Sequence, residues 1–195
     1  DVHDTDETVP ILWWRSVGNS IHGFVVNGVI DELATLAGRD AYDFRRELLA
    51  AHPRALAVLD AAATDAGWGK PLPKGHHLGL AFYFSHAGHV AQVADVSVSP
   101  SRQLVVHRVT VAADVGPIVN MSGAENQVQG SVIDGLSTLL AQRMTFEQGR
   151  ALETNFHQYP THFLLVVLKL ISILLVHLHH QHEVHHVSQH STVST

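Results

Sequence analysis

Histidine is the residue type in this sequence with the widest chemical range, because an imidazole ligates metals and carries protons near neutral pH. The chain contains 17 histidines and no cysteine. A zinc site needs three or four ligands at a recognisable spacing, and no carboxylate or thiolate completes such a set in the middle of the chain. We therefore expect ordinary loop histidines there and no metal site. The residues concerned are His76, His77, His86, His89 and His107.

A second group of histidines lies near the carboxyl end of the chain. Clustered imidazoles bind nickel or copper in vitro almost regardless of the fold that carries them. Such binding is a property of composition and does not by itself indicate a biological role. It leaves open one alternative function, a small binding module whose tail captures metal. The residues are His177, His179, His180, His182, His185, His186 and His190.

The composition and the missing motifs argue against several classes of function. The sequence has no nucleophile elbow, Walker loop or dinucleotide fingerprint. Because Cys is absent, disulfides, thiolate zinc sites and cysteine-ligated iron–sulfur clusters are excluded in this chain. Lys and Arg number 12 against 18 Asp and Glu, which gives a formal charge of −6 without a basic cluster. We therefore expect no nucleic-acid partner.

The first third of the chain has the periodicity of helices. One helix is expected to start at Asn19 or Ser20 and to bury a single apolar stripe. A second, shorter helix is expected after a cap at Asp40, and a third begins at Pro53, a tolerated first helical position. The stripe of the first helix comprises Ile21, Phe24, Val25, Val29, Leu33 and Leu36.

The middle of the chain changes to the period of strands. Alternating apolar residues predict strands over 78–84, 90–98 and 104–111, the last two joined by a short turn. A final hairpin is expected over 145–152. Between the strands and this hairpin, a long helix is predicted, with Ser122 and Glu125 as a capping box. Its expected buried stripe comprises Val128, Val132, Leu136, Leu139 and Leu140.

These segments together predict an α+β fold with N-terminal helices, an antiparallel β-sheet of three to five strands and one long helix packed on it. The composition changes after Pro160. The run from Phe163 to Val176 is almost wholly apolar, but it is shorter than the roughly 20 residues that span a bilayer. We expect a buried or aggregation-prone segment there, and not a membrane helix.

Seven short blocks of the sequence carry a family resemblance, over about residues 11–160. As a set, in their order and spacing, they resemble the molybdopterin-binding large subunit of xanthine dehydrogenase and aldehyde oxidase-type enzymes. Within that family they are most similar to the beta subunits of isoquinoline 1-oxidoreductases and to related membrane-linked aldehyde dehydrogenases. The blocks are Trp14–Ser20, Ile30–Ala34, Val90–Ala94, His107–Val109, Asp114–Gly116, Gln127–Gly130 and Asn155–Pro160.

The resemblance implies the chemistry of a molybdenum hydroxylase. Such an enzyme oxidises N-heterocycles or aldehydes, takes its oxygen from water and holds molybdenum in a molybdopterin cofactor. Electrons leave through iron–sulfur clusters in a partner subunit, so the implied partners are an iron–sulfur small subunit and a cytochrome subunit. The implied location is periplasmic or membrane-associated. The pterin dithiolene holds the metal, and therefore no protein metal ligand is expected.

The resemblance also implies a cofactor site. Arg15, Ser16, Val17 and Gly18 match the segment beside the oxo ligand of the metal, and Gln127 matches a glutamine that contacts the pterin. Without the resemblance, Arg15 is interpreted as part of a surface ion pair and Gln127 as a solvated helix position.

Departures from the family pattern limit what is expected of this chain. The catalytic base of the family is a Glu in a Gly-rich loop after the Tyr-Pro block, and Glu183, the acidic residue beyond Pro160, has no glycine beside it. We therefore assign no catalytic residue. Residues 1–160 are interpreted as a partial molybdopterin-binding domain that lacks its N-terminal part and is inactive alone. Residues 161–195 are interpreted as an atypical apolar and His-rich tail, which a frameshift would explain. A non-enzymatic remnant is the other alternative.

Overall fold

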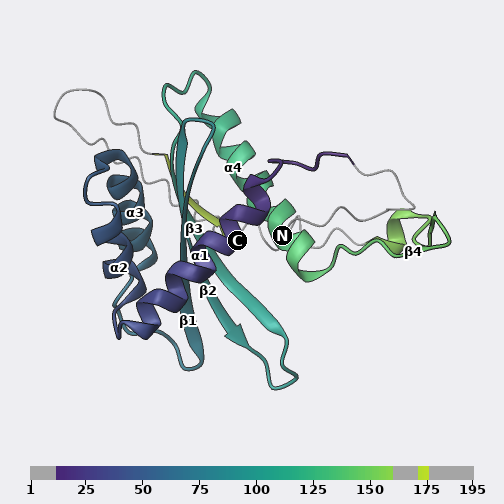
Figure 1. Ribbon diagram of the computed structural model, residues 1–195, viewed down its shortest axis with the longest axis horizontal. Helices are drawn as coiled ribbons and strands as arrows, with labels where there is room; N and C mark the ends of the chain where they lie inside the picture. Colours follow the sequence, from purple (N-terminus) through teal and green to yellow (C-terminus); the bar gives the residue numbers. More distant parts are fainter. Residues whose placement is uncertain (1–11, 160–170, 176–195) are drawn as a thin grey trace, which may run out of the picture.

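A β-sheet with helices on both faces and a further helix along one edge makes up the fold (Figure 1). The structure, a computed structural model, describes residues 12–159 and 171–175. The expected α+β class is confirmed, with the helices of the first third preceding the sheet and one long helix following it.

The centre of the sheet is an antiparallel meander of three strands. Strands β1 (His76–Ser85) and β2 (Gly88–Val98) form a hairpin, and β2 pairs in turn with β3 (Leu104–Asp114). The two residues between β1 and β2, His86 and Ala87, have φ of 49° and 61°. Two-residue hairpin turns require this left-handed conformation because it matches the twist of the strands. The three strands confirm those expected from the alternation of apolar residues.

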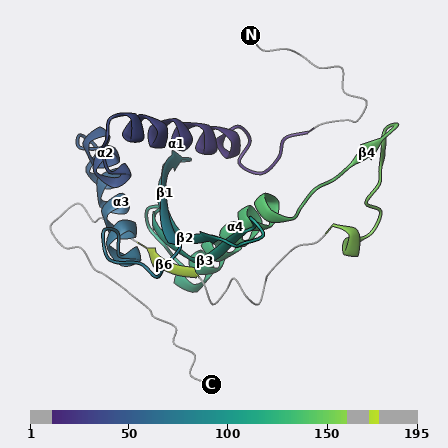
Figure 2. The ribbon, with the colours of Figure 1, turned by 90° about the horizontal axis from the view of Figure 1, so that it is seen from below.

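A fourth strand and a separate hairpin extend this arrangement. Strand β6 (Ile171–Leu175) pairs with β3 in parallel, so the sheet has the order β1-β2-β3-β6 and is mixed rather than purely antiparallel. The expected final hairpin is formed by β4 (Phe146–Glu147) and β5 (Arg150–Ala151), which extend away from the sheet (Figures 1 and 2). A 3-10 turn, η1 (Phe156–Gln158), follows.

The sheet buries a different core on each of its faces, because neighbouring residues of a strand point to opposite sides. Helix α3 (Pro53–Ala66) covers one face and helix α4 (Met121–Leu140) the other (Figure 2). The core under α3 contains Val58, Leu59, Ala62, Ala66, Leu80, Ala91, Val93 and Ala112. The core under α4 contains Val109, Val111 and Val132, with Val90, Ala94, Val106, Val128 and Leu136 packed around them.

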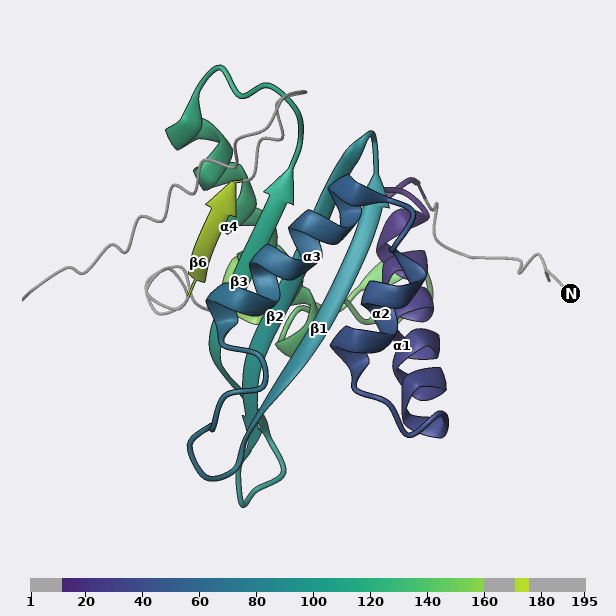
Figure 3. The same ribbon diagram turned by 90° about the vertical axis from the view of Figure 1, so that its left-hand side faces the viewer.

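Helix α1 (Asn19–Leu36) runs along the outer edge of β1, and α2 (Ala41–Leu48) lies between α1 and α3 (Figure 3). The side-chain amide of Asn27 accepts a hydrogen bond from the N–H of Phe82 at 3.0 Å and donates one to its carbonyl oxygen at 3.0 Å. This amide pairs with both backbone groups of Phe82 on the free edge of β1, as a neighbouring strand would.

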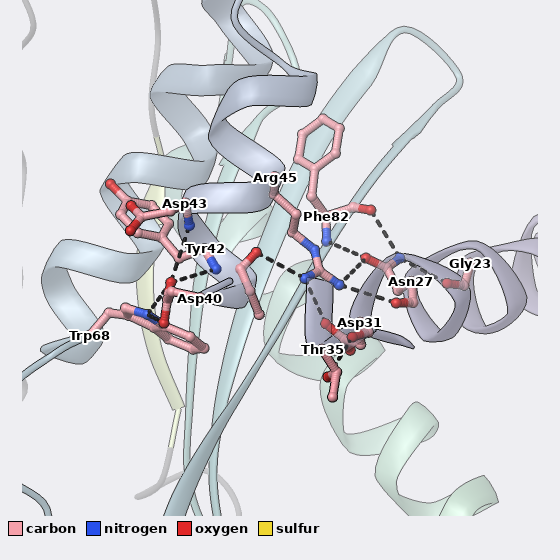
Figure 4. A network of polar contacts seen from close by, with 11 residues as sticks. Gly23, Asn27, Asp31, Thr35, Asp40, Tyr42, Asp43, Arg45, Trp68 and Phe82 are labelled. Carbon is pink, nitrogen blue, oxygen red and sulfur yellow. Dashed lines mark hydrogen bonds and ion pairs between the residues drawn. The ribbon is translucent and has the colours of Figure 1, made fainter. Parts of the chain in front are cut away.

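A buried arginine joins α2 to α1. Arg45 is 2% exposed, and its guanidinium donates to a carboxylate oxygen of Asp31 at 2.6 Å and to the carbonyl oxygen of Asn27 at 3.2 Å (Figure 4). Asp40 caps α2 as expected, because its carboxylate accepts from the N–H groups of Tyr42 and Asp43.

Three expectations about the helices are wrong. The apolar stripe of α1 does form on one side of the helix, but all six of its residues are exposed, and the side turned to the sheet carries Asn27 and Ala34. In α4 the cap is Asn120 and not Ser122, since the Asn120 side chain accepts from the N–H of Gly123 at 2.9 Å. Leu139 and Leu140, expected in the buried stripe of α4, are exposed because they lie beyond the residues that pack on the sheet.

Most of the tail lies outside the described residues, including the histidines from His177 onward and Glu183. Within the described ranges, no helix is both long enough and apolar enough to cross a membrane.

Candidate functional site

The segment that precedes α1 forms a strained turn. Ser16 and Val17 both have left-handed backbones, with φ of 65° and 51°. The N–H of Val17 donates to the carbonyl oxygen of Trp14 and that of Asn19 to the carbonyl oxygen of Ser16, both at 3.0 Å. A β-branched residue in this region of the backbone is an outlier, and such residues persist where the surrounding structure holds them, often at functional sites.

An ion pair ties this turn to the other end of the described chain. The guanidinium of Arg15 donates to the carboxylate of Asp134, a residue in the middle of α4. The hydrogen bond to Asp134 and its negative charge raise the pKa of Arg15 above its ordinary value. Both side chains are accessible to solvent. The contact therefore places Arg15, Ser16, Val17 and Gly18 beside α4 without burying them.

Gln127 lies on the same side of α4 as Asp134. Seven residues separate the two, which is two helical turns, or about 10 Å along the axis at 1.5 Å per residue. Gln127 is exposed, and a Cβ added at the neighbouring Gly130 would meet no atom within 4 Å. The structure thus brings the two expected parts of the cofactor site, more than a hundred residues apart in the sequence, to one open side of one helix.

The groups on this side of α4 can hydrogen-bond a polar heterocycle. A guanidinium and a primary amide offer several N–H donors, and the amide also accepts. The strained turn adds backbone groups of the kind that bind cofactors closely. The described residues contain no group of three or more His, Asp or Glu side chains placed to hold a metal ion directly. A metal carried by its own organic ligand is compatible with this set, since the protein then supplies only orientation and charge.

A second polar cluster, which the sequence reasoning did not assign, joins α3 to the end of β3. The carboxylate of Asp114, 1% exposed, accepts two hydrogen bonds of 2.9 Å from Arg54 and one of 3.1 Å from the N–H of Gly116. Burial alone would raise the pKa of Asp114, but the bonds from Arg54 and Gly116 outweigh it and lower this pKa below its ordinary value. The Asp114-Val115-Gly116 block was the available signal, and its role is to hold the turn after β3.

The middle histidines lie mostly in strands, which corrects the expectation of loop histidines. His76 and His77 belong to β1, His89 to β2 and His107 to β3, and only His86 lies in a turn. The alternation of apolar residues predicted strands in this region, but it does not show which imidazole rings contact each other. The imidazoles of His76 and His107 stack with centroids 3.9 Å apart.

The polar partners of these stacked rings explain their place in the sheet. Nδ1 of His76 lies 2.8 Å from a carboxylate oxygen of Asp95, and Nε2 of His107 lies 2.7 Å from the hydroxyl of Ser97. One ring nitrogen of each imidazole is thus engaged within the sheet, and the contacts link three strands.

Comparison with known proteins gives a consistent result. A family model described as the molybdopterin cofactor-binding domain matches residues 36–162. The beta subunit of isoquinoline 1-oxidoreductase from Brevundimonas diminuta is 32% identical over 157 residues, covering 78% of this chain and 20% of the relative. The nicotinate dehydrogenase subunit from Pseudomonas putida is 28% identical over 177 residues, covering 82% of this chain and 15% of the relative.

A third relative has a similar relation to the chain. Membrane-bound aldehyde dehydrogenase [pyrroloquinoline-quinone] of Gluconacetobacter polyoxogenes is 28% identical over 167 residues, covering 75% of this chain and 22% of the relative. The chain therefore spans about a fifth of the length of the curated relatives that it matches.

Proposed function

Because this chain belongs to the molybdopterin cofactor-binding domain family, we propose that residues 1–160 form part of the cofactor domain of a molybdenum hydroxylase large subunit. When complete, such a subunit oxidises an N-heterocycle or an aldehyde with water as the source of oxygen. The bound cofactor supplies the metal-centred redox chemistry. The 195 residues alone are inactive in this proposal, because no residue of the chain matches the catalytic Glu and its Gly-rich loop.

The observation that carries the proposal is the meeting of the Arg15 turn with α4. Arg15 contacts Asp134, and Gln127 lies two turns away on the same side of that helix. In the proposed role, the Gln127 amide donates and accepts hydrogen bonds at the edge of the pterin. Ser16, Val17 and Gly18 hold the backbone close to the metal end, and Asp134 fixes the direction of the Arg15 guanidinium.

Proposed partners follow from the same assignment. Two of the relatives are named as subunits, so they work within larger assemblies. Because this chain contains no cysteine, it cannot itself ligate an iron–sulfur cluster through thiolates. We assign the clusters to a small subunit and add a cytochrome subunit as a further partner. We propose a periplasmic or membrane-associated location, in line with a relative that is named as membrane-bound.

Molybdenum and pterin content test this function. The full chain is purified alone. A chimera is also made, in which residues 1–160 of this chain replace the matching region of the isoquinoline 1-oxidoreductase beta subunit. We expect no molybdenum in the chain alone, and molybdenum with pterin in the chimera. Gln127→Ala in the chimera should lower both contents while the amount of folded protein stays constant, and Gln142→Ala in the loop after α4 is the matched control.

Three results would contradict the proposal. Molybdenum and turnover in the chain alone would show that no further part is needed. A folded but empty chimera would favour a non-enzymatic remnant. Nickel or copper binding that disappears on removal of residues 161–195, with the rest of the chain empty, would favour the small binding module.

A further inference from the structure

Helix α1 has its large apolar side chains on the side away from the protein. Ile21 is 67% exposed, Phe24 81% and Leu36 84%. The opposite side, which faces β1, carries the buried Asn27 and Ala34, and a Cβ added at Gly23 would lie 3.8 Å from the ring of Tyr83. A surface helix of a soluble protein normally has the reverse arrangement. The outer side, which we call the α1 outer face, comprises Ile21, Phe24, Val25, Val29, Leu33 and Leu36.

Buried polar contacts fix this orientation of the helix. The Asn27 amide is bonded to both backbone groups of Phe82, and the guanidinium of Arg45 reaches Asn27 and Asp31 (Figure 4). Rotating α1 to bury its apolar side would break these bonds and leave buried polar groups unpaired. The exposed apolar face is therefore a consequence of the fold, and contiguous faces of this kind mark interaction sites.

One charged residue sits within the α1 outer face. Glu32 is eleven residues after Ile21 and four before Leu36, which places it in the middle of the stripe at 3.6 residues per turn. Asp31 is engaged by Arg45, whereas Glu32 makes no hydrogen bond or ion pair within the described residues. Beside it lies a shallow, open depression lined by Asp31, Glu32, Thr35 and Leu36. A partner that covers this face must supply a donor to Glu32, because an unpaired carboxylate in an apolar interface is costly.

We propose that the α1 outer face docks against the part of the large subunit that lies outside these 195 residues, through an apolar segment with a Lys or Arg opposite Glu32. This inference rests on the proposed function. The matched region covers 15–22% of the curated relatives, so most of such a subunit is available to cover this face.

The charge of α1 disfavours the other occupants. A helix that lies on a membrane surface usually carries Lys and Arg beside its apolar side, and α1 has neither. A second copy docked face to face through α1 likewise offers Glu32 no lysine or arginine from that helix. A separate polypeptide segment can supply both an apolar surface for the α1 outer face and a Lys or Arg for Glu32.

Binding to the remainder of a relative tests the proposal. The probe is the isoquinoline 1-oxidoreductase beta subunit of Brevundimonas diminuta with its matching region deleted, shown by circular dichroism and size-exclusion chromatography to be folded, and titrated with the full chain. We expect a one-to-one complex that Phe24→Glu with Leu36→Glu weakens by about tenfold or more, as for the loss of central interface residues. Glu32→Lys should weaken the complex by a similar factor, because the new lysine would face the proposed Lys or Arg of the docking segment. Val119→Glu, at a fully exposed residue between β3 and α4, is the control and should bind like the parent chain.

Further measurements distinguish the competing occupants. Because Phe24 and Leu36 are exposed, the thermal unfolding midpoint of the double variant should equal that of the parent chain, which excludes misfolding as the cause of lost binding. A homodimer that the double variant dissociates would assign the face to a second copy and overturn the proposal. Binding to phosphatidylglycerol vesicles that depends on Phe24 would overturn it in favour of a membrane, and equal binding by all variants, or none by the parent, would also overturn it.

The outcome is separable from that of the proposed function. Binding is measured without molybdenum or turnover, so an empty chimera with intact, Phe24-dependent binding would contradict only the cofactor assignment. A loaded chimera whose assembly is indifferent to Phe24, Leu36 and Glu32 would contradict only the docking surface.

Discussion

Helices α1 and α3 have the same kind of sequence pattern and opposite relations to the rest of the protein. The apolar stripe of α3 is buried against the sheet, with Val58 and Leu59 fully inaccessible. The apolar residues of α1 point away from it, and Asn27 lies on the inner side. An apolar stripe therefore predicts that a helix will be covered, but not whether the same polypeptide covers it.

The two contact surfaces explain the difference. Helix α3 lies across the face of the sheet, where small apolar residues such as Ala62 and Ala66 allow close packing on β2 and β3. Helix α1 lies at the edge of β1, where unpaired peptide groups need hydrogen bonds. A polar residue such as Asn27 is favoured at such an edge, so the apolar side of α1 must turn outward.

Truncation of one leucine in each helix tests the comparison most directly. Leu59→Ala should lower the free energy of unfolding by about 2–5 kcal/mol, because it leaves a cavity in a filled core. Leu36→Ala, the matched change in α1, should alter it by no more than about 0.5 kcal/mol, since that side chain is exposed in the isolated chain. Urea unfolding of both variants measures the effect. Similar losses would mean that α1 is covered within the chain.

Removal of the buried arginine tests what orients α1. Arg45→Ala should cost about 2–4 kcal/mol, because bonds from a buried charged donor to Asp31 and Asn27 are lost together. Arg46→Ala is the neighbouring control, and its exposed pair with Asp60 predicts little change. Equal effects of the two changes would show that the Arg45 contacts do not hold α1. Hydrogen exchange of the α1 amides adds a local readout, which should rise only in Arg45→Ala.

The contacts of Asp114 with Arg54 of α3 predict that the free energy of unfolding depends on pH. Because the pKa of Asp114 is lowered in the folded protein, its contribution is present above the unfolded value near 4 and is lost as pH falls through the folded value. Asp114→Asn should cost about 2 kcal/mol at pH 7, as for a charge-assisted hydrogen-bond pair. Its unfolding free energy should then fall less steeply than that of the parent chain below pH 4. An unchanged slope would contradict the assigned pKa direction.

The Arg15–Asp134 pair should show the smallest effect on stability. Both groups are solvated, so neither Arg15→Met nor Asp134→Asn should measurably change the unfolding midpoint. Either change should release the turn before α1, which limited proteolysis near Trp13 and Trp14 detects. The charge-swapped double variant, Arg15→Asp with Asp134→Arg, should restore protection. Cleavage that is the same in all variants would show that the pair does not hold the turn.

Much of the fold followed from local patterns. Alternation of apolar residues identified β1, β2 and β3, and the sequence around residue 148 identified the β4–β5 hairpin. The cap of α4 was misplaced because Ser122 and Glu125 satisfy a capping-box spacing, while Asn120, two residues earlier, makes the bond to Gly123. The candidate site residues came from the family resemblance, because an exposed Arg15 or Gln127 has no local signature.

The sequence by itself determined the helices and strands up to residue 152, since backbone propensity and side-chain period act over a few residues. It also determined that α1 has one apolar side. Only the tertiary structure decided that this side faces outward, that β6 joins β3 in parallel and that Arg15 meets Asp134. Those outcomes depend on which surfaces meet, and hydrogen bonds at a sheet edge and charges more than a hundred residues apart leave no periodic trace in the chain.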